Sequence, residues 1–178
     1  MSLAGAYMLM GKRDKMLEYA HKALEIESNN SVVLSSVITI SYMENKYEEA
    51  LNYLEALRTI PNDARDNRRD KKQQGLYFLV KCSYSLHKYE QAETLAKECI
   101  AVNPNSSFPY ATLAETYSLM GKDEAFYEAL EDALKRGILA KTLIEDAPYQ
   151  RFLKKKRFKD LLKKYEQKTA PLDQIAKN

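Results

Sequence analysis

A short helical plan recurs four times along this chain: an apolar segment, a brief polar break and a second segment with a small residue near its end. The breaks fall at Gly11-Lys12, Asn45-Lys46, His87-Lys88 and Gly121-Lys122, with spacings of 34, 42 and 34 residues. A period of this length indicates supersecondary units that bury their apolar faces by stacking on one another. The repeat therefore restricts the chain to an array of stacked units.

Aligning the units on their breaks brings other residues into shared columns. Eight positions upstream of each break stand Leu3, Val37, Leu79 and Leu113, and twelve positions downstream stand Ala23, Leu57, Cys99 and Ala133. Within the second segments, apolar residues recur at three- and four-residue steps, which is the stripe of an amphipathic helix. Gly and Pro, at five residues each, are too scarce to interrupt many helices. Each unit is therefore predicted to be a pair of helices.

Polar turns separate the predicted pairs. The stretch 103–106 offers Asn105 or Ser106 as the N-cap of the helix that follows. The stretches 28–31 and 61–63 are rich in the same turn and cap residues and are expected to do similar work.

The shared columns resemble the tetratricopeptide repeat (TPR). The fourth unit matches best, with Tyr110, Leu113, Ala114, Tyr117, Gly121 and Ala133. The resemblance implies an all-α fold, a right-handed superhelical solenoid of helix-turn-helix repeats (an α-α superhelix). Some residues depart from the family pattern, because Ser28 and Asn62 replace Pro and Leu57 replaces a small residue. Phe126 falls where the pattern has a packing Ala, unless the helix starts one residue early. These positions are expected to loosen the repeat register locally.

The pattern predicts three regions. Residues 1–137 hold four TPR-like repeats, of which the first is truncated, and an eight-residue insertion lies near 63–72. Residues 138–168 form C-terminal capping helices, similar to endings of bacterial members of the family, and residues 169–178 form a disordered tail. The insertion is too charged to be buried, so it either prolongs the first helix of the third unit or forms a solvated loop.

The C-terminal region carries the basic character of the chain. Residues 1–137 hold 17 basic and 20 acidic side chains, whereas residues 138–178 hold 11 and 5. Apolar residues at 158, 161, 162 and 165 draw one helical stripe, which predicts a cap that seals the last repeat. Its opposite face forms a basic patch of Arg151, Lys154, Lys155, Lys156, Arg157 and Lys159. The favoured interpretation is a solvated cap, and the alternative is contact with nucleic acid or an anionic surface.

The sequence lacks the usual catalytic motifs. It has no Gly-x-Gly-x-x-Gly, no Gly-Lys-Ser/Thr and no Gly-x-Ser-x-Gly. Its two cysteines and two histidines are not spaced as metal ligands. We therefore expect no enzyme activity, no cofactor and no metal.

The family geometry implies that the first helices of successive units line a concave groove that binds a protein or peptide. The groove residues would be Ser36, Thr39, Tyr42, Tyr77, Phe78, Lys81, Tyr84, Phe108, Thr112 and Glu115. Aromatic side chains among polar neighbours make good binding anchors, although the tyrosines could equally be helix packing. The expected function is a protein-interaction scaffold, with self-association through exposed repeat ends as a further alternative. No stretch is apolar enough to span a membrane, and a cytoplasmic location is favoured if the chain is complete.

Overall fold

The computed structural model describes residues 13–62 and 67–175, and every regular element in these two ranges is a helix. The helices are α2 (Arg13–Ile26), α3 (Ser31–Met43), α4 (Tyr47–Leu51), α5 (Leu54–Arg58), α6 (Arg68–Ser85), α7 (Tyr89–Val102), α8 (Phe108–Leu119), α9 (Asp123–Lys135), α10 (Ala140–Leu143), α11 (Ala147–Gln150) and α12 (Lys156–Ile175). The prediction of an all-α chain is confirmed.

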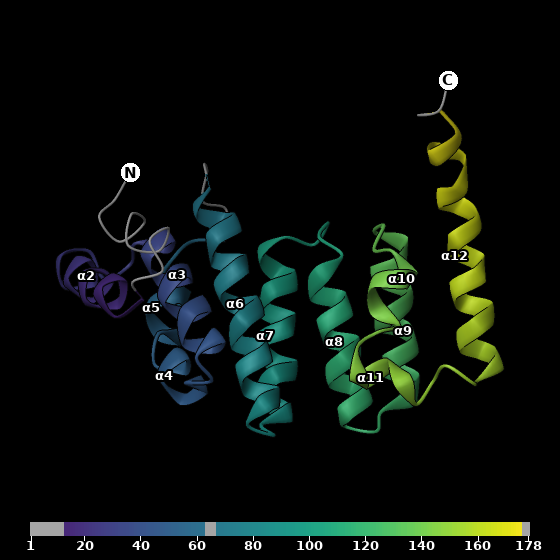
Figure 1. Ribbon diagram of the computed structural model, residues 1–178, viewed down its shortest axis with the longest axis horizontal. Helices are drawn as coiled ribbons and strands as arrows, with labels where there is room; N and C mark the ends of the chain where they lie inside the picture. The colour runs from purple at the N-terminus through teal and green to yellow at the C-terminus, as the bar shows by residue number, and fades with distance from the viewer. Residues whose placement is uncertain (1–12, 63–66, 176–178) are drawn as a thin grey trace.

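The helices form a row of stacked hairpins (Figure 1). Within the hairpins α3 packs on α4, α6 on α7 and α8 on α9, and α6 also contacts both α3 and α8. The first helices of the predicted units therefore lie next to one another. Their buried apolar side chains join one continuous core from α3 to α12.

The predicted breaks are left-handed turns. Asn45, His87 and Gly121 have φ angles of 60°, 59° and 72°. The next N–H in each turn donates to a carbonyl five residues earlier: Lys46 to Ser41 at 2.8 Å, Lys88 to Ser83 at 2.8 Å, and Lys122 to Tyr117 at 2.9 Å. This pattern is a Schellman motif, which ends one helix and redirects the chain into the next. Three of the four predicted breaks are thus confirmed, and Gly11 lies outside the described residues.

The predicted caps are partly confirmed. Asn30 caps α3, because its side-chain oxygen accepts a hydrogen bond from the Val33 N–H at 3.1 Å. The prediction of Asn105 or Ser106 as the cap of α8 is wrong, since the helix begins after Ser107. Asn103 explains the later start: its side chain accepts from the Asn105 N–H at 3.2 Å and holds the preceding turn.

The insertion prolongs a helix, and one of its charges is buried. Residues 68–72 form the first turns of α6, whereas residues 63–66 lie outside the described ranges. Lys72 is only 6% exposed. Its ammonium donates to the Asn62 side chain at 2.8 Å, to the carbonyl of Arg58 at the end of α5 and to the carbonyl of Ile60 just after that helix. Burial lowers the pKa of Lys72. The expectation that the whole run stays in solvent is wrong here, because these oxygens replace water around the charge.

The second helix of unit two is interrupted, where the apolar stripe predicts a single helix. The break between α4 and α5 lies at Asn52 and Tyr53, whose N–H groups donate three residues back, to Glu49 at 3.1 Å and Ala50 at 3.3 Å. Tyr53 also meets His21 of α2, with its hydroxyl 2.7 Å from the imidazole Nε2.

Aromatic packing seats the C-terminal segment on the last repeat. The fully buried ring of Phe126 stacks on Phe152 with centroids 3.8 Å apart and an interplanar angle of 4°. Phe158 follows at 6.2 Å from Phe126, and the Tyr149 hydroxyl donates to the Ala111 carbonyl of α8 at 3.1 Å. The departure from the family pattern at Phe126 therefore supplies the surface on which this segment packs.

The C-terminal segment forms three helices. Pro148 lies in the first turn of α11, and α11 packs on α8 while α12 packs on α9. The predicted stripe on α12 contacts the core through the buried Phe158 and Tyr165 and the partly buried Leu161 and Leu162. Helix α12 continues to Ile175 and so enters the range expected to form a tail.

Candidate partner-binding surface

Three of the predicted groove aromatics meet between α3 and α6. The ring of Phe78 lies 5.3 Å from that of Tyr42 and 5.2 Å from that of Tyr77, measured between centroids. All three side chains are half-buried and pack against the core. These rings therefore join two repeats and also keep part of their surface in solvent.

Lys81 and Glu115 form a nearly buried ion pair between α6 and α8. Their side chains are 12% and 5% exposed. The Lys81 ammonium also lies over the rings of Tyr77 and Tyr84, at 5.6 Å and 5.0 Å from their centroids. These two predicted groove charges satisfy one another, so neither is free to bind a partner.

Burial and charge act in opposite directions on this pair. Burial raises the pKa of Glu115, and the nearby ammonium of Lys81 only partly offsets the effect. Burial alone lowers the pKa of Lys81, but the Glu115 carboxylate and the two tyrosines outweigh it and hold the pKa above its ordinary value. The Lys81 side chain therefore stays protonated at neutral pH.

The predicted groove hydroxyls bond within their own helices. Ser36 donates to the Val32 carbonyl at 2.7 Å, Thr39 to Ser35 at 2.6 Å and Thr112 to Phe108 at 3.0 Å. Thr112 is also 2% exposed. These hydroxyls are therefore less available to a partner than the aromatic side chains.

A cleft of about 330 Å³ opens between α6 and α8. It is lined by Tyr77 and Phe78 of α6 and by Phe108 of α8, a residue that is 64% exposed. The structure thus brings three predicted groove residues to one cavity. The remaining lining residues are Asp70, Gln73, Gln74, Cys99, Ser106 and Pro109.

Gln73 and Gln74 are two of the polar lining residues that the sequence analysis does not predict, together with Asp70 and Ser106. Both glutamines precede the aromatic pair Tyr77-Phe78 by one helical turn, which places them on the same face of α6. Gln74 accepts a hydrogen bond from Lys71 at 3.1 Å. The Gln73 amide nitrogen is buried and has no hydrogen-bond partner in the described part of the chain. The spacing of the two glutamines from Tyr77 and Phe78 could have indicated from the sequence that they share a helix face. The missing hydrogen-bond partner of Gln73 is visible only in the structure.

Cys99 adds a buried thiol to the lining. Burial raises its pKa to about 12, so the thiol stays protonated near neutral pH and is a poor nucleophile.

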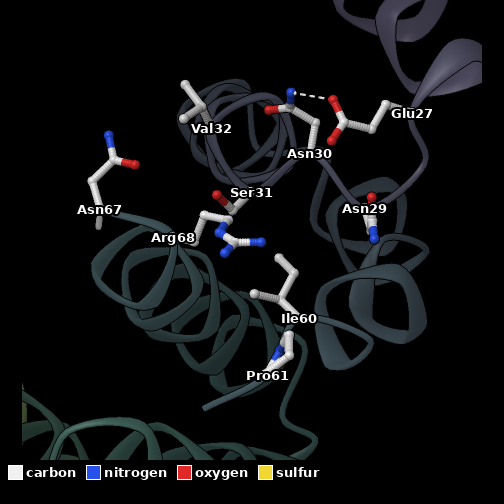
Figure 2. A pocket seen from close by; sticks show the side chains of 9 residues that line it. All are labelled: Glu27, Asn29, Asn30, Ser31, Val32, Ile60, Pro61, Asn67 and Arg68. Carbon is white, nitrogen blue, oxygen red and sulfur yellow. Dashed lines mark hydrogen bonds between the residues drawn. The ribbon is translucent and has the colours of Figure 1, made fainter. Parts of the chain in front are cut away.

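A smaller cavity of about 190 Å³ lies where the α2–α3 turn meets the end of α5 and the start of α6. Figure 2 shows Arg68 reaching between Ser31 and Ile60 at its centre. On its rim Asn30 donates to Glu27 at 2.9 Å. This cavity contains none of the predicted groove residues.

Half of the predicted basic patch docks the C-terminal segment on α9. Arg151 and Lys155 both bind the Asp123 carboxylate, the latter at 2.7 Å, and Arg157 binds Glu124 at 2.6 Å. These hydrogen bonds hold the pKa values of both carboxyls below their ordinary range. The other three members, Lys154, Lys156 and Lys159, are exposed and make no ion pair with the described residues.

Residues 13–62 and 67–175 contain neither a candidate metal site nor a candidate membrane span. No group of three or more His, Cys, Asp or Glu side chains in these ranges is placed to hold a metal ion. No helix there is both long and apolar enough to cross a membrane.

The arrangement of helices resembles two solved structures. The crystal structure of MamA matches with a TM-score of 0.74 and 16% identity over 98% of both chains. The fold is a TPR-like helical solenoid. A structure titled MamA MSR-1 C2 matches with a TM-score of 0.60 and 18% identity over 75% of this chain and 72% of its own. No family model matches the sequence, and no curated protein matches it. At these identities the TPR-like likeness concerns the fold alone.

Proposed function

We propose that the chain is a non-enzymatic scaffold that holds a segment of a partner protein in the cleft between α6 and α8. The observation that carries the proposal is the exposed ring of Phe108 opposite Tyr77 and Phe78. Large aromatic side chains gathered around a cleft supply much of the binding energy at protein interfaces. The cavity volume of about 330 Å³ also falls within the range of ligand sites.

The rest of the predicted groove supports the scaffold rather than the contact. Lys81 and Glu115 form an ion pair with each other. The hydroxyls of Ser36, Thr39 and Thr112 form hydrogen bonds within their own helices. Of these residues, Lys81 and Glu115 link α6 to α8. The cleft aromatics are the part of the groove that a partner can cover.

The basic patch carries less weight as a binding site. Arg151, Lys155 and Arg157 are paired with carboxylates of α9, which leaves three exposed lysines. Contact with nucleic acid through these lysines would show a steep loss of affinity with salt.

Selection of peptides from a random display library on the immobilised chain tests the proposal. We expect the selected peptides to bind the Phe108→Ala variant at least about tenfold more weakly, since an anchoring aromatic contributes more than about 1.4 kcal/mol. Leu119→Ala is the matched control, because Leu119 is 39% exposed on the same helix and does not line the cleft. Equal binding by the parent and both variants would refute the proposal.

A further inference from the structure

We infer that the partner inserts an arginine side chain into the α6–α8 cleft, with its guanidinium stacked on Phe108 and bound by the Asp70 carboxylate. This inference rests on the proposed function and names the chemistry of the side chain that the cleft holds. It depends on the make-up of the lining and on two arginine sites elsewhere in the same molecule.

The lining of the cleft combines aromatic rings with one negative charge. Of its nine residues, three are aromatic and one, Asp70, is charged. The face of an aromatic ring carries partial negative charge, so rings and a carboxylate together attract a cation. The cleft lining therefore favours a positively charged side chain that can also cover an apolar ring.

The Asp70 carboxylate can accept such a cation. Its side chain is 66% exposed, and its ion pair in the described residues is with Arg69, whose Nε lies 3.6 Å from Asp70 Oδ1. This distance is longer than a good hydrogen bond, and an exposed ion pair of this kind contributes little to stability. Arg69 and Lys71 do not line the cleft, and Lys71 donates to Gln74 at 3.1 Å. A ligand guanidinium can therefore replace Arg69 beside Asp70 at little cost.

A second carboxylate acts on the same group of rings. Asp146 lies in the turn between α10 and α11, where it is exposed and forms no ion pair with the described residues. Burial raises the pKa of Tyr77, and the Asp146 carboxylate adds to this effect. Lys81 and Glu115 also act on Tyr77, but their opposite charges form a pair. The charge that remains on this side of Tyr77 is therefore negative.

Two arginines of the chain bind a ring and a carboxylate together. The guanidinium of Arg136 lies 3.8 Å from the centroid of the Tyr110 ring and 3.3 Å from the Asp132 carboxylate. Arg157 repeats the arrangement, with the ring of Tyr127 at 4.0 Å and a glutamate of α9 at 2.6 Å. A ring beside a carboxylate is therefore a site that arginine occupies in this fold.

The cleft offers the same two groups to a partner. Phe108 is 64% exposed, and no cation of the described residues lies over its ring. Asp70 lines the same cavity. Arginine fits this pair better than lysine, because the planar guanidinium stacks on a ring and binds a carboxylate through two N–H groups, whereas the ammonium is compact and strongly hydrated.

Matched peptides test the inference. The probes are acetyl-Gly-Arg-Gly-amide and its citrulline counterpart, each titrated into the full chain and followed by NMR. Citrulline keeps the planar end group of arginine but carries no charge. We expect the arginine peptide to bind at least about fivefold more tightly than the citrulline peptide and to shift the ring signals of Phe108.

Substitutions at the cleft supply the controls. Asp70→Asn should reduce the preference for arginine over citrulline to about twofold or less. Asp14→Asn, at an exposed aspartate in the first turn of α2, should preserve it. Arg69→Gln should strengthen binding of the arginine peptide, because it removes the cation that competes for Asp70. An unchanged preference in Asp70→Asn would overturn the inference.

The display-library selection separates this inference from the proposed function. Selected peptides that share an arginine and lose affinity in Phe108→Ala support both. Selected peptides that lose affinity in Phe108→Ala but share no arginine would overturn the inference and leave the scaffold cleft intact. Equal binding of the arginine and citrulline peptides, or binding of neither, would also overturn the inference alone. An empty selection would refute the proposed function and the inference with it.

Discussion

The side chain of Leu57 lies against the backbone of Gly75. A Cβ atom added at Gly75 would meet Leu57 Cδ2 at 2.9 Å and Cδ1 at 3.1 Å, and Ile38 Cδ1 at 3.4 Å. Leu57 stands in a column where the repeat prefers a small residue, and the missing side chain of Gly75 in the middle of α6 makes room for it. The larger residue on α5 is thus matched by the smallest residue on α6.

This relationship predicts that Gly75→Ala destabilises the chain. Alanine is the better helix former by about 1 kcal/mol, but the added methyl clashes with Leu57, and overpacking costs about 1–3 kcal/mol. We expect a lower urea midpoint for Gly75→Ala. Relative to Leu57→Ala, the added Gly75→Ala change should instead be neutral or stabilising, because the obstructing side chain is gone. A Gly75→Ala variant as stable as the parent would show that α6 can move away without cost.

We expect the removal of one charge of the Lys81–Glu115 pair to destabilise the fold much more than the removal of both. Lys81→Met or Glu115→Leu leaves a nearly buried charge without its partner, which costs about 3–5 kcal/mol. The double variant replaces both charges with apolar side chains and should recover most of that loss. Urea unfolding of the four proteins gives the coupling free energy. A coupling near zero would mean that water already screens the pair.

The left-handed turns predict a stabilising substitution. His87 has a φ of 59°, a conformation that costs a non-glycine residue about 1 kcal/mol, whereas glycine adopts it readily. We expect His87→Gly to raise the free energy of unfolding by about 0.5–1 kcal/mol. The gain should be smaller at Asn45, because asparagine tolerates this conformation. Thermal unfolding of the two variants shows whether the gain at position 87 exceeds the gain at position 45. A smaller gain at position 87 would mean that the exposed His87–Tyr89 hydrogen bond, which His87→Gly removes, contributes to stability.

Glu93 predicts a loss of stability in acid. Its carboxylate accepts hydrogen bonds from Lys97 at 2.7 Å, Lys122 at 3.0 Å and Tyr117 at 3.2 Å. The two lysines lower the pKa of Glu93 to about 2. A depressed carboxyl pKa stabilises the fold above the unfolded value near 4.5, and the contribution disappears as pH falls toward 2. The urea midpoint of Glu93→Gln should therefore decline less steeply over this interval than that of the parent. Parallel declines would assign the acid sensitivity to other carboxyls.

Local chemistry made the repeat predictable, and distant contacts limited the rest. The turns at Asn45, His87 and Gly121 are set by residues within one helical turn, so the aligned breaks found them. The burial of Lys72 depends on carbonyls at the end of another helix, which no local pattern reveals. The charged composition of the insertion therefore predicts that Lys72 is exposed to solvent, whereas in the fold its ammonium is bound by protein oxygen atoms.

The candidate site was predictable to the same degree. Tyr77, Phe78 and Phe108 follow from the helix faces of the repeat, and the structure brings them to one cleft. The engagement of Lys81 with Glu115 was missed because the two residues lie 34 positions apart. The basic patch was read as one solvated face for the same reason, since the carboxylates that bind Arg151, Lys155 and Arg157 lie on α9.

The stack of Phe126 on Phe152 also bears on how such an array can change in length. Phe126 belongs to the last hairpin, and its ring is covered by a segment that does not follow the repeat plan. A hairpin added after α9 would have to present its own match for Phe126 and displace Phe152, which requires coordinated substitutions. A hairpin duplicated between α3 and α9 meets only repeat-like neighbours. The array is therefore expected to gain or lose units in its interior while its C-terminal end stays fixed.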